Sequence, residues 1–151
     1  MVNDLARLFA RDLNKVAKQI QSFEEEPQLW MVLPGIANTA GNLVLHLEGN
    51  LREYVGRQLG GIEYTRNRPS EFENVPVPAS DLLQRIEHLA AIVPKVIQSL
   101  QEPQLSAMYP ENVLGSEMTT HFFLIHLHGH LNYHLGQIDY LRRILTKGKA
   151  L

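Results

Sequence analysis

Apolar residues recur every three or four positions in four long segments of the chain, and no segment alternates apolar and polar residues as a strand does. These segments cover about residues 2–22, 38–60, 80–101 and 116–148. The 151 residues suffice for one domain with a buried core. The pattern therefore predicts an all-α fold, a four-helix bundle that forms a single domain over residues 1–151.

Local signals indicate where the helices begin and end. Asn38 or Thr39 is a suitable N-cap for the second helix, and the glycine pair at residues 60–61 should end it. Ser116 is the expected N-cap of the fourth helix. Pro94 lies inside the third helical pattern and is expected to kink or split that helix.

The connections carry topological information. Residues 27–37 and 102–115 read as loops, and residues 60–79 form a longer one. A long crossover allows consecutive helices to run parallel, whereas short loops force antiparallel neighbours. The second and third helices are therefore expected to be parallel, which is not the order of a simple up-down-up-down bundle.

Composition excludes several classes of function. A formal net charge of -2 does not fit the basic surface that nucleic-acid binding needs. With 0 cysteines, the chain has no disulfide, thiolate metal ligand or cysteine nucleophile. No apolar run reaches the roughly 18 residues of a membrane span, and residues 1–20 read as a bundle helix rather than a signal peptide. We expect no nucleic-acid or membrane partner and a cytoplasmic location.

Histidines concentrate in the last helical segment, where five of the seven lie between His121 and His134. His130 and His134 are about one helical turn apart, so their imidazoles share a face. His46 lies on the apolar stripe of the second helix. A buried imidazole without partners costs about 1–3 kcal/mol, whereas a shared divalent ion would bind all three. The three histidines therefore predict a metal site.

An alternative that these residues leave open is a helical interaction module whose core histidines simply pack and hydrogen-bond. The remaining histidines receive lesser roles. His126, one turn before His130, falls at the edge of the stripe and could line the cavity or bind the ion. We interpret His88 and His128 as surface or packing residues, and His121 as an exposed residue at the start of the helix.

The expected ligands constrain the metal and its surroundings. All-nitrogen ligation suits zinc, nickel, copper or iron. Three protein ligands leave a position for water or substrate, as in catalytic sites. Asn50 and Gln137 are the nearest polar residues on the same helix faces, and either could orient a ligand or substrate. For Asn50, an ordinary interhelical hydrogen bond is the favoured interpretation.

Two segments resemble the DinB-like superfamily, whose four-helix bundles bind metal through one histidine on the second helix and an H-x3-H pair on the fourth. They are GNLVLHLEGNLREYV, residues 41–55, and HLNYHLGQIDYLRRIL, residues 130–145. The sequence LGGIEYTRNRPSEF, residues 59–72, is similar to the long crossover of one branch that has no assigned activity. The resemblance covers nearly the whole chain.

The resemblance implies an up-down-down-up order of helices, with the long crossover between the second and third. It also implies homodimers and a divalent ion, zinc, nickel or iron, held by His46, His130 and His134. Characterised relatives transfer or isomerise with thiols such as bacillithiol, mycothiol or glutathione. This chain shows no arginine cluster committed to a thiol's carboxylates, and Arg142 and Arg143 are expected at the surface or in a dimer contact.

The function that the resemblance implies is a metal-dependent transferase, acting on a small molecule with a low-molecular-weight thiol. The alternative is a non-catalytic metal-binding or stress-associated dimer. Whether the protein is an enzyme stays open at this stage, as do the metal, the thiol and the electrophile.

Overall fold

The computed structural model describes residues 2–148, and its named elements in this range are all helical, which confirms the predicted all-α class. The long helices are α1 (Val2–Gln21), α2 (Ala40–Leu51), α3 (Ala79–Ser99) and α5 (Thr120–Thr146). Shorter segments are the 3-10 turns η1 (Glu26–Trp30) and η3 (Pro69–Glu71), the π-helical turn η2 (Arg52–Arg57) and the helix α4 (Glu102–Ser106). No helix in the described range is long and apolar enough to cross a membrane.

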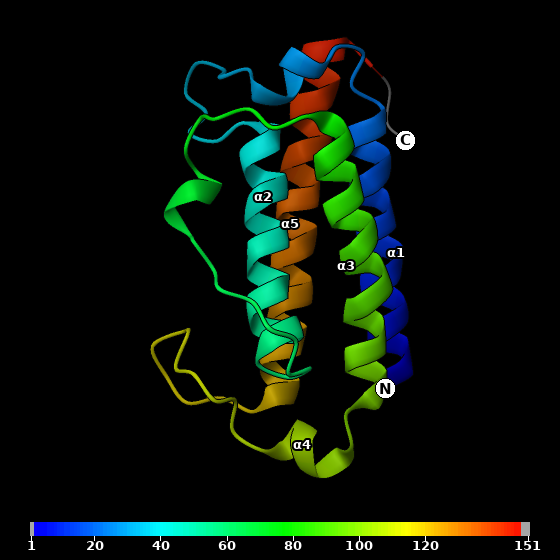
Figure 1. Ribbon diagram of the computed structural model, residues 1–151, viewed down its shortest axis with the longest axis vertical. Coiled ribbons are helices and arrows are strands. Elements are labelled where there is room, and N and C mark those ends of the chain that lie inside the picture. The colour runs from blue at the N-terminus through cyan, green and yellow to red at the C-terminus, as the bar shows by residue number, and fades with distance from the viewer. Residues whose placement is uncertain (1, 149–151) are drawn as a thin grey trace.

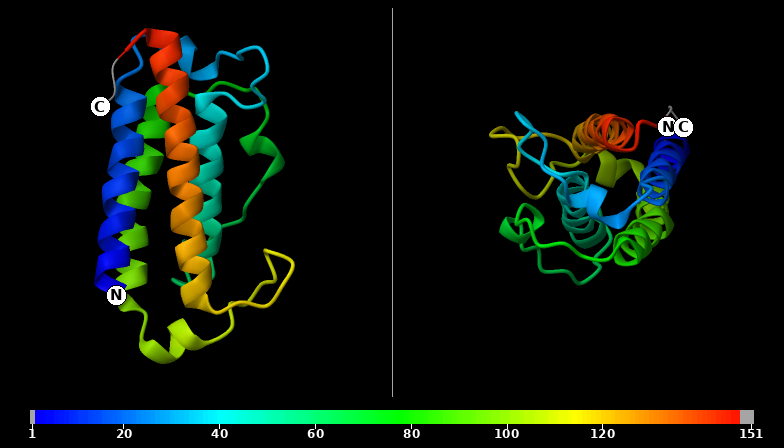
Figure 2. Two further views of the ribbon diagram at one scale, coloured as in Figure 1. Left: turned by 180° about the vertical axis from the view of Figure 1, so that it is seen from behind. Right: turned by 90° about the horizontal axis from the view of Figure 1, so that it is seen from above.

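The long helices pack side by side around one apolar core (Figure 1, Figure 2). α1 contacts α3 and α5, and α2 contacts the same two helices. In Figure 1, α1 and α5 begin at the bottom of the view, whereas α2 and α3 both begin at the top. The largest fully buried side chains are Phe9, Phe123, Leu13, Leu29, Leu47, Leu51, Leu82, Ile86, Leu89, Ile97, Leu124 and Leu127.

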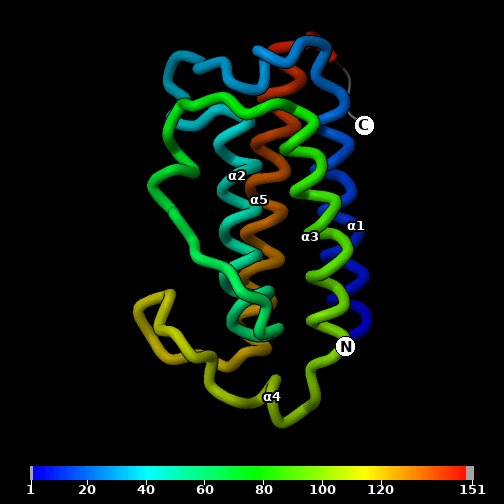
Figure 3. Tube along the Cα trace, viewed as in Figure 1, coloured from blue at the N-terminus to red at the C-terminus, as the bar shows by residue number. Residues whose placement is uncertain are grey.

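The segment between η2 and α3, residues 58–78, is a long crossover that returns along the outside of α2 (Figure 3). It is needed because α2 and α3 begin at the same end of the molecule. Asn42 on α2 fastens it, since the side-chain amide donates to the backbone carbonyls of Glu71 (3.1 Å) and Glu73 (3.0 Å). The crossover thereby lies against the face of α2 that carries His46.

One predicted helix start is confirmed and another is wrong. Thr39 is the N-cap of α2, and its hydroxyl accepts a backbone N–H three residues further on, at 3.1 Å. Ser116 is not the N-cap of the last helix, because α5 begins at Thr120 with Thr119 as its cap. The reason is an antiparallel bridge between Met108 and Thr119, which holds the chain extended just before α5.

Two segments predicted as loops contain short helices. Both η1 and α4 begin with Glu-Pro-Gln-Leu, at residues 26–29 and 102–105. In each, proline occupies the first turn, where no N–H is needed, and the glutamine side chain accepts the N–H of the capping residue. Pro94 lies within an uninterrupted α3, so the third helix does not split.

A buried carboxylate joins α1 to α5. Asp12 is fully buried, and its Oδ2 accepts hydrogen bonds from His128 (2.9 Å) and Asn132 (3.0 Å), while Arg11 donates to both carboxylate oxygens. Burial by itself would raise the pKa of Asp12, but these hydrogen bonds outweigh burial and hold the pKa well below its usual range. His128 packs against Phe9, as a packing residue should, and also links the two helices.

Arg142 is also part of the contact between α1 and α5. Its side chain is buried and donates to Gln19 Oε1 (2.6 Å) and Asp139 Oδ1 (3.0 Å). The expectation that Arg142 lies at the surface is therefore wrong, because the polar partners on both helices allow the guanidinium to be buried. Arg143 is partly exposed, with its guanidinium over the ring of Tyr140.

Replacing Asp12 tests this buried link. Asp12→Ala leaves the donors of His128 and Asn132 without their acceptor, and we expect the free energy of unfolding to fall by about 1–3 kcal/mol. Urea denaturation followed by circular dichroism measures the change. Glu87→Ala, at an exposed position of α3, is the matched control. An Asp12→Ala protein as stable as that control would contradict the assigned role.

Candidate metal centre

Three histidines from two helices converge in the middle of the bundle. His46 comes from α2, and His130 and His134 come from α5. The Nε2 atom of His130 lies 3.1 Å from Nε2 of His46 and 3.0 Å from Nε2 of His134. One ring nitrogen from each residue falls within 4.8 Å of the others, so the three could hold a metal ion. The structure thus brings together the three residues that the sequence singled out.

The opposite ring nitrogens determine which atoms face the centre. His46 Nδ1 lies 2.8 Å from Glu71 Oε2, so Nδ1 carries the proton and donates to the carboxylate. His134 Nδ1 lies 2.7 Å from Gln137 Oε1 and donates to it in the same way. A neutral imidazole protonated at Nδ1 has a lone pair at Nε2. Two lone pairs therefore point toward Nε2 of His130.

Hydrogen bonds alone do not satisfy this arrangement. If His130 is protonated at Nε2, its single N–H donates to only one of the two lone pairs. Its Nδ1 is buried and has no hydrogen-bond partner. A cation among the three Nε2 atoms would accept every lone pair at once. In tetrahedral zinc sites with Zn–N near 2.0–2.1 Å, ligand nitrogens lie about 3.3 Å apart. This is close to the 3.1 and 3.0 Å that separate His130 Nε2 from Nε2 of His46 and of His134. The residues present fit a divalent ion.

Glu71 and Arg66 belong to the same site, and sequence reasoning missed both. Arg66 binds the carboxylate of Glu71 in a bidentate pair, with Nε–Oε1 at 2.7 Å and Nη2–Oε2 at 2.9 Å. Burial would raise the pKa of Glu71, but hydrogen bonds from His46 and Arg66 hold it below its ordinary value. Gly49 makes the approach sterically feasible, since a Cβ there would collide with the Glu71 carboxylate.

A signal for these two residues was present but had no chemical meaning by itself. They lie in the crossover sequence at residues 59–72, whose resemblance to relatives concerned the loop alone. Their distance from His46 along the chain hides the contact. The crossover runs along α2 (Figure 1). Only this course brings Glu71 Oε2 within 2.8 Å of His46 Nδ1.

One cavity of about 340 Å³ adjoins the histidines. It is lined by His46, Asn50, Tyr54, Arg66, Arg68, Val113, Phe123, His126, Leu127 and His130. His126 is exposed and stacks on Phe123, with ring centroids 5.9 Å apart. Asn50 is buried, and its side-chain oxygen has no partner. The favoured expectation of an interhelical hydrogen bond is therefore wrong for that oxygen, which belongs to the cavity lining.

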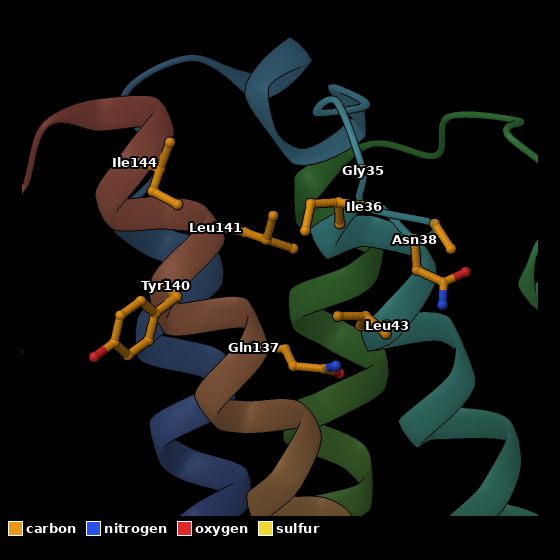
Figure 4. Close-up of a pocket in the computed structure, with 9 residues that line it drawn as sticks. Gly35, Ile36, Asn38, Leu43, Gln137, Tyr140, Leu141 and Ile144 are labelled. Carbon is orange, nitrogen blue, oxygen red and sulfur yellow. The ribbon is translucent and has the colours of Figure 1, made fainter.

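Gln137 faces a second, more apolar cavity of about 450 Å³, toward the C-terminal half of α5 (Figure 4). Its other lining residues are Gly35, Ile36, Ala37, Asn38, Leu43, Tyr140, Leu141 and Ile144. Gln137 also bonds His134, so one lining residue connects this cavity to the histidine cluster. His88 is exposed on α3 and half-buried His121 starts α5, both apart from the three Nε2 atoms.

The site keeps its imidazoles neutral. Burial, assisted by repulsion from His134 and His46, lowers the pKa of His130 to about 3. Burial also lowers the pKa of His134, against the opposing effect of its hydrogen bond with Gln137. At pH 7 both rings are therefore neutral and able to act as ligands.

Comparison with solved structures shows a DinB-like fold. A crystal structure of a DinB-like protein from Bacillus cereus ATCC 10987 matches with a TM-score of 0.68 and 19% identity, over 89% of this chain and 86% of that chain. At this identity the match shows the fold alone. The family described as "Protein of unknown function (DUF1572)" matches residues 2–150, and the chain belongs to this DinB-like family. No curated protein matches the chain.

The lowered pKa of His130 predicts how the stability of the metal-free protein changes with pH. An unfolded histidine titrates near 6.5, whereas His130 in the folded protein titrates at about 3. Below about pH 6.5, His130 binds a proton in the unfolded chain but stays neutral in the folded protein. The contribution of neutral His130 to the free energy of unfolding is therefore fully present above pH 6.5 and is lost as the pH falls toward 3. Denaturant melts between pH 7.5 and 5.5 should show this loss, and His130→Gln should reduce it. An unchanged slope in His130→Gln, with His88→Gln as the control, would contradict the assignment.

Proposed function

We propose that this protein binds a divalent transition metal through Nε2 of His46, His130 and His134, and that it is a metal-dependent transferase using a low-molecular-weight thiol. The observation that carries the proposal is the convergence of three imidazole nitrogens beside a cavity large enough for a small substrate. The proposal includes the up-down-down-up helix order of the resemblance, supported by the helix courses in Figure 1.

The protein's own residues would prepare the site in defined ways. Glu71 accepts a hydrogen bond from the Nδ1–H of His46. This bond fixes the ring orientation and leaves Nε2 free to bind metal. Gln137 does the same for His134. Zinc, nickel and iron all suit three imidazoles with an open position. When bound, such an ion would supply the Lewis acidity that lowers the pKa of a coordinated thiol.

The reaction class follows from a thiol activated beside a cavity. The thiol proton passes to solvent, and a sulfur electron pair forms the new bond to an electrophilic carbon. The leaving group departs with the pair of the bond that breaks. The cavity walls would hold the electrophile near the sulfur and exclude bulk water. A cytoplasmic location, expected from the sequence, would supply reduced thiols.

Metal content tests the first part of the proposal. Protein purified without a histidine tag and loaded with zinc or nickel should hold one ion per chain by elemental analysis. His46→Ala and His130→Ala should lose it, whereas His88→Ala should retain it. Glu71→Ala should weaken metal affinity about 10–100-fold, because it removes the acceptor that orients His46. Folded wild-type protein that takes up no metal would reject the proposal.

Activity tests the second part. Metal-loaded protein should conjugate glutathione, bacillithiol or mycothiol to an aryl halide electrophile. A chelator should abolish the activity and added metal should restore it. Stoichiometric metal without transfer across the panel would favour a non-catalytic metal-binding protein instead.

We also assign the proposed homodimer to one face of α5. Its exposed residues recur at steps of three and four along the helix: Phe122, Ile125, Gly129, Tyr133, Gly136, Tyr140 and Ile144. This uncharged α5 stripe has the spacing of a helix–helix seam. A Cβ at either glycine would meet no atom within 4 Å, so another helix could approach closely.

The α5 stripe is close to palindromic about Tyr133, which favours a second copy of this chain as its partner. The residues that meet in an antiparallel pair are Phe122 with Ile144, Ile125 with Tyr140, and Gly129 with Gly136. A two-fold interface requires this kind of self-complementary surface. The same partner helix would lie next to the apolar cavity, which Tyr140 and Ile144 line (Figure 4).

A charge on the α5 stripe tests the dimer. Wild-type protein should elute as a dimer in light-scattering chromatography, and Ile125→Glu should shift it to a monomer, because the charge would be buried in the interface. Val32→Glu, at an equally exposed position in the loop after η1, should remain dimeric. A dimeric Ile125→Glu protein, or a monomeric wild type, would rule out this interface.

A further inference from the structure

The cavity beside the histidines has an unbalanced positive charge. Its described lining includes two arginines, Arg66 and Arg68, and no acidic residue. Arg66 is neutralised by its bidentate pair with Glu71. Arg68 makes no ion pair with a carboxylate in the described part of the chain. One uncompensated guanidinium therefore faces the same cavity as the histidine cluster.

The position of Arg68 is supported by aromatic packing. Its guanidinium lies over the ring of Phe72, 5.3 Å from the centroid. Phe72 in turn packs on the imidazole of His46, with centroids 5.0 Å apart. Arg68 is exposed, so its charge remains available to a ligand that enters from solvent. The contact with Phe72 keeps an otherwise flexible side chain next to the site.

A second group in the cavity also lacks a partner. Asn50 is 7% exposed, and its buried Oδ1 accepts no hydrogen bond. A buried carbonyl oxygen without a donor costs about 1–3 kcal/mol, which a ligand N–H or O–H would recover. The cavity therefore offers one cationic group and one acceptor to a small molecule whose third contact is the open metal position.

We infer that the cavity selects a carboxylate-bearing substrate, with Arg68 binding the carboxylate and Asn50 accepting a neighbouring N–H or O–H. Because the inference rests on the proposed metal site, it specifies the substrate class for that site. An acylated amino-acid thiol has all three features: a sulfur for the metal, a carboxylate and an amide N–H. Arg68 acts here as a specificity-determining residue, and Arg66 serves to hold Glu71.

Two probes of nearly equal size measure how much the carboxylate contributes to binding. N-acetylcysteine and N-acetylcysteinamide differ only in carboxylate versus carboxamide. Protein loaded with Co²⁺ in place of the native ion would report thiol binding through its absorption spectrum. Titration should show that wild-type protein prefers the carboxylate probe by about tenfold, the size of one charge-assisted hydrogen bond. Added salt should weaken this preference.

The variants separate this inference from the proposed function. Arg68→Gln should reduce the carboxylate preference to near unity while the affinity for Co²⁺ stays unchanged. Arg7, an exposed α1 arginine outside the cavity lining, provides the control, and Arg7→Gln should retain the carboxylate preference of the wild type. Asn50→Leu should weaken both probes. A ratio that is unchanged in Arg68→Gln, or already near unity in wild type, would overturn the inference with the metal site intact. Failure of Co²⁺ to bind at all would overturn the proposed function instead.

Discussion

The hydrogen bond between His46 Nδ1 and the Glu71 carboxylate, at 2.8 Å, organises the centre of this molecule. It assigns the proton of His46 to the outer nitrogen and turns the inner lone pair toward α5. It also secures the crossover against α2, together with the bonds from Asn42 to the crossover backbone. One contact thus couples the order of the helices to the chemistry of the site.

The cavity lined by His46 and His130 and the cavity lined by Gln137 differ in character. The one lined by Asn50, Arg68 and His126 is polar and cationic, whereas the one lined by Leu43, Tyr140 and neighbouring residues is largely apolar. A two-substrate reaction needs separate places for two different molecules. The proposed reaction could use the polar cavity, which His46 and His130 line, and the apolar cavity, which Gln137 links to His134.

Much of the fold could be predicted from residue patterns, because amphipathic periodicity determines which helix face is buried. That periodicity located His46, His130 and His134 on inward faces and put His126 at the edge. N-cap residues predicted the helix starts less reliably. Thr39 is the N-cap of α2 as predicted, but α5 begins later than predicted because Thr119 forms a bridge with Met108. Glu71 and Arg66 could not be predicted, since no local rule says where a long crossover will lie. The prediction that Arg142 lies at the surface was wrong, because its burial depends on Gln19, a partner on another helix.

The proposed function requires that three imidazoles hold one ion and leave a position for a ligand. X-ray absorption spectroscopy of protein loaded with one equivalent of zinc tests it most directly. We predict three histidine ligands and one light, exchangeable ligand at about 2.0–2.2 Å, replaced by sulfur at about 2.3 Å when a thiol is added. A first shell with fewer than three imidazoles, or one closed by a fourth protein ligand that thiol does not displace, would contradict it.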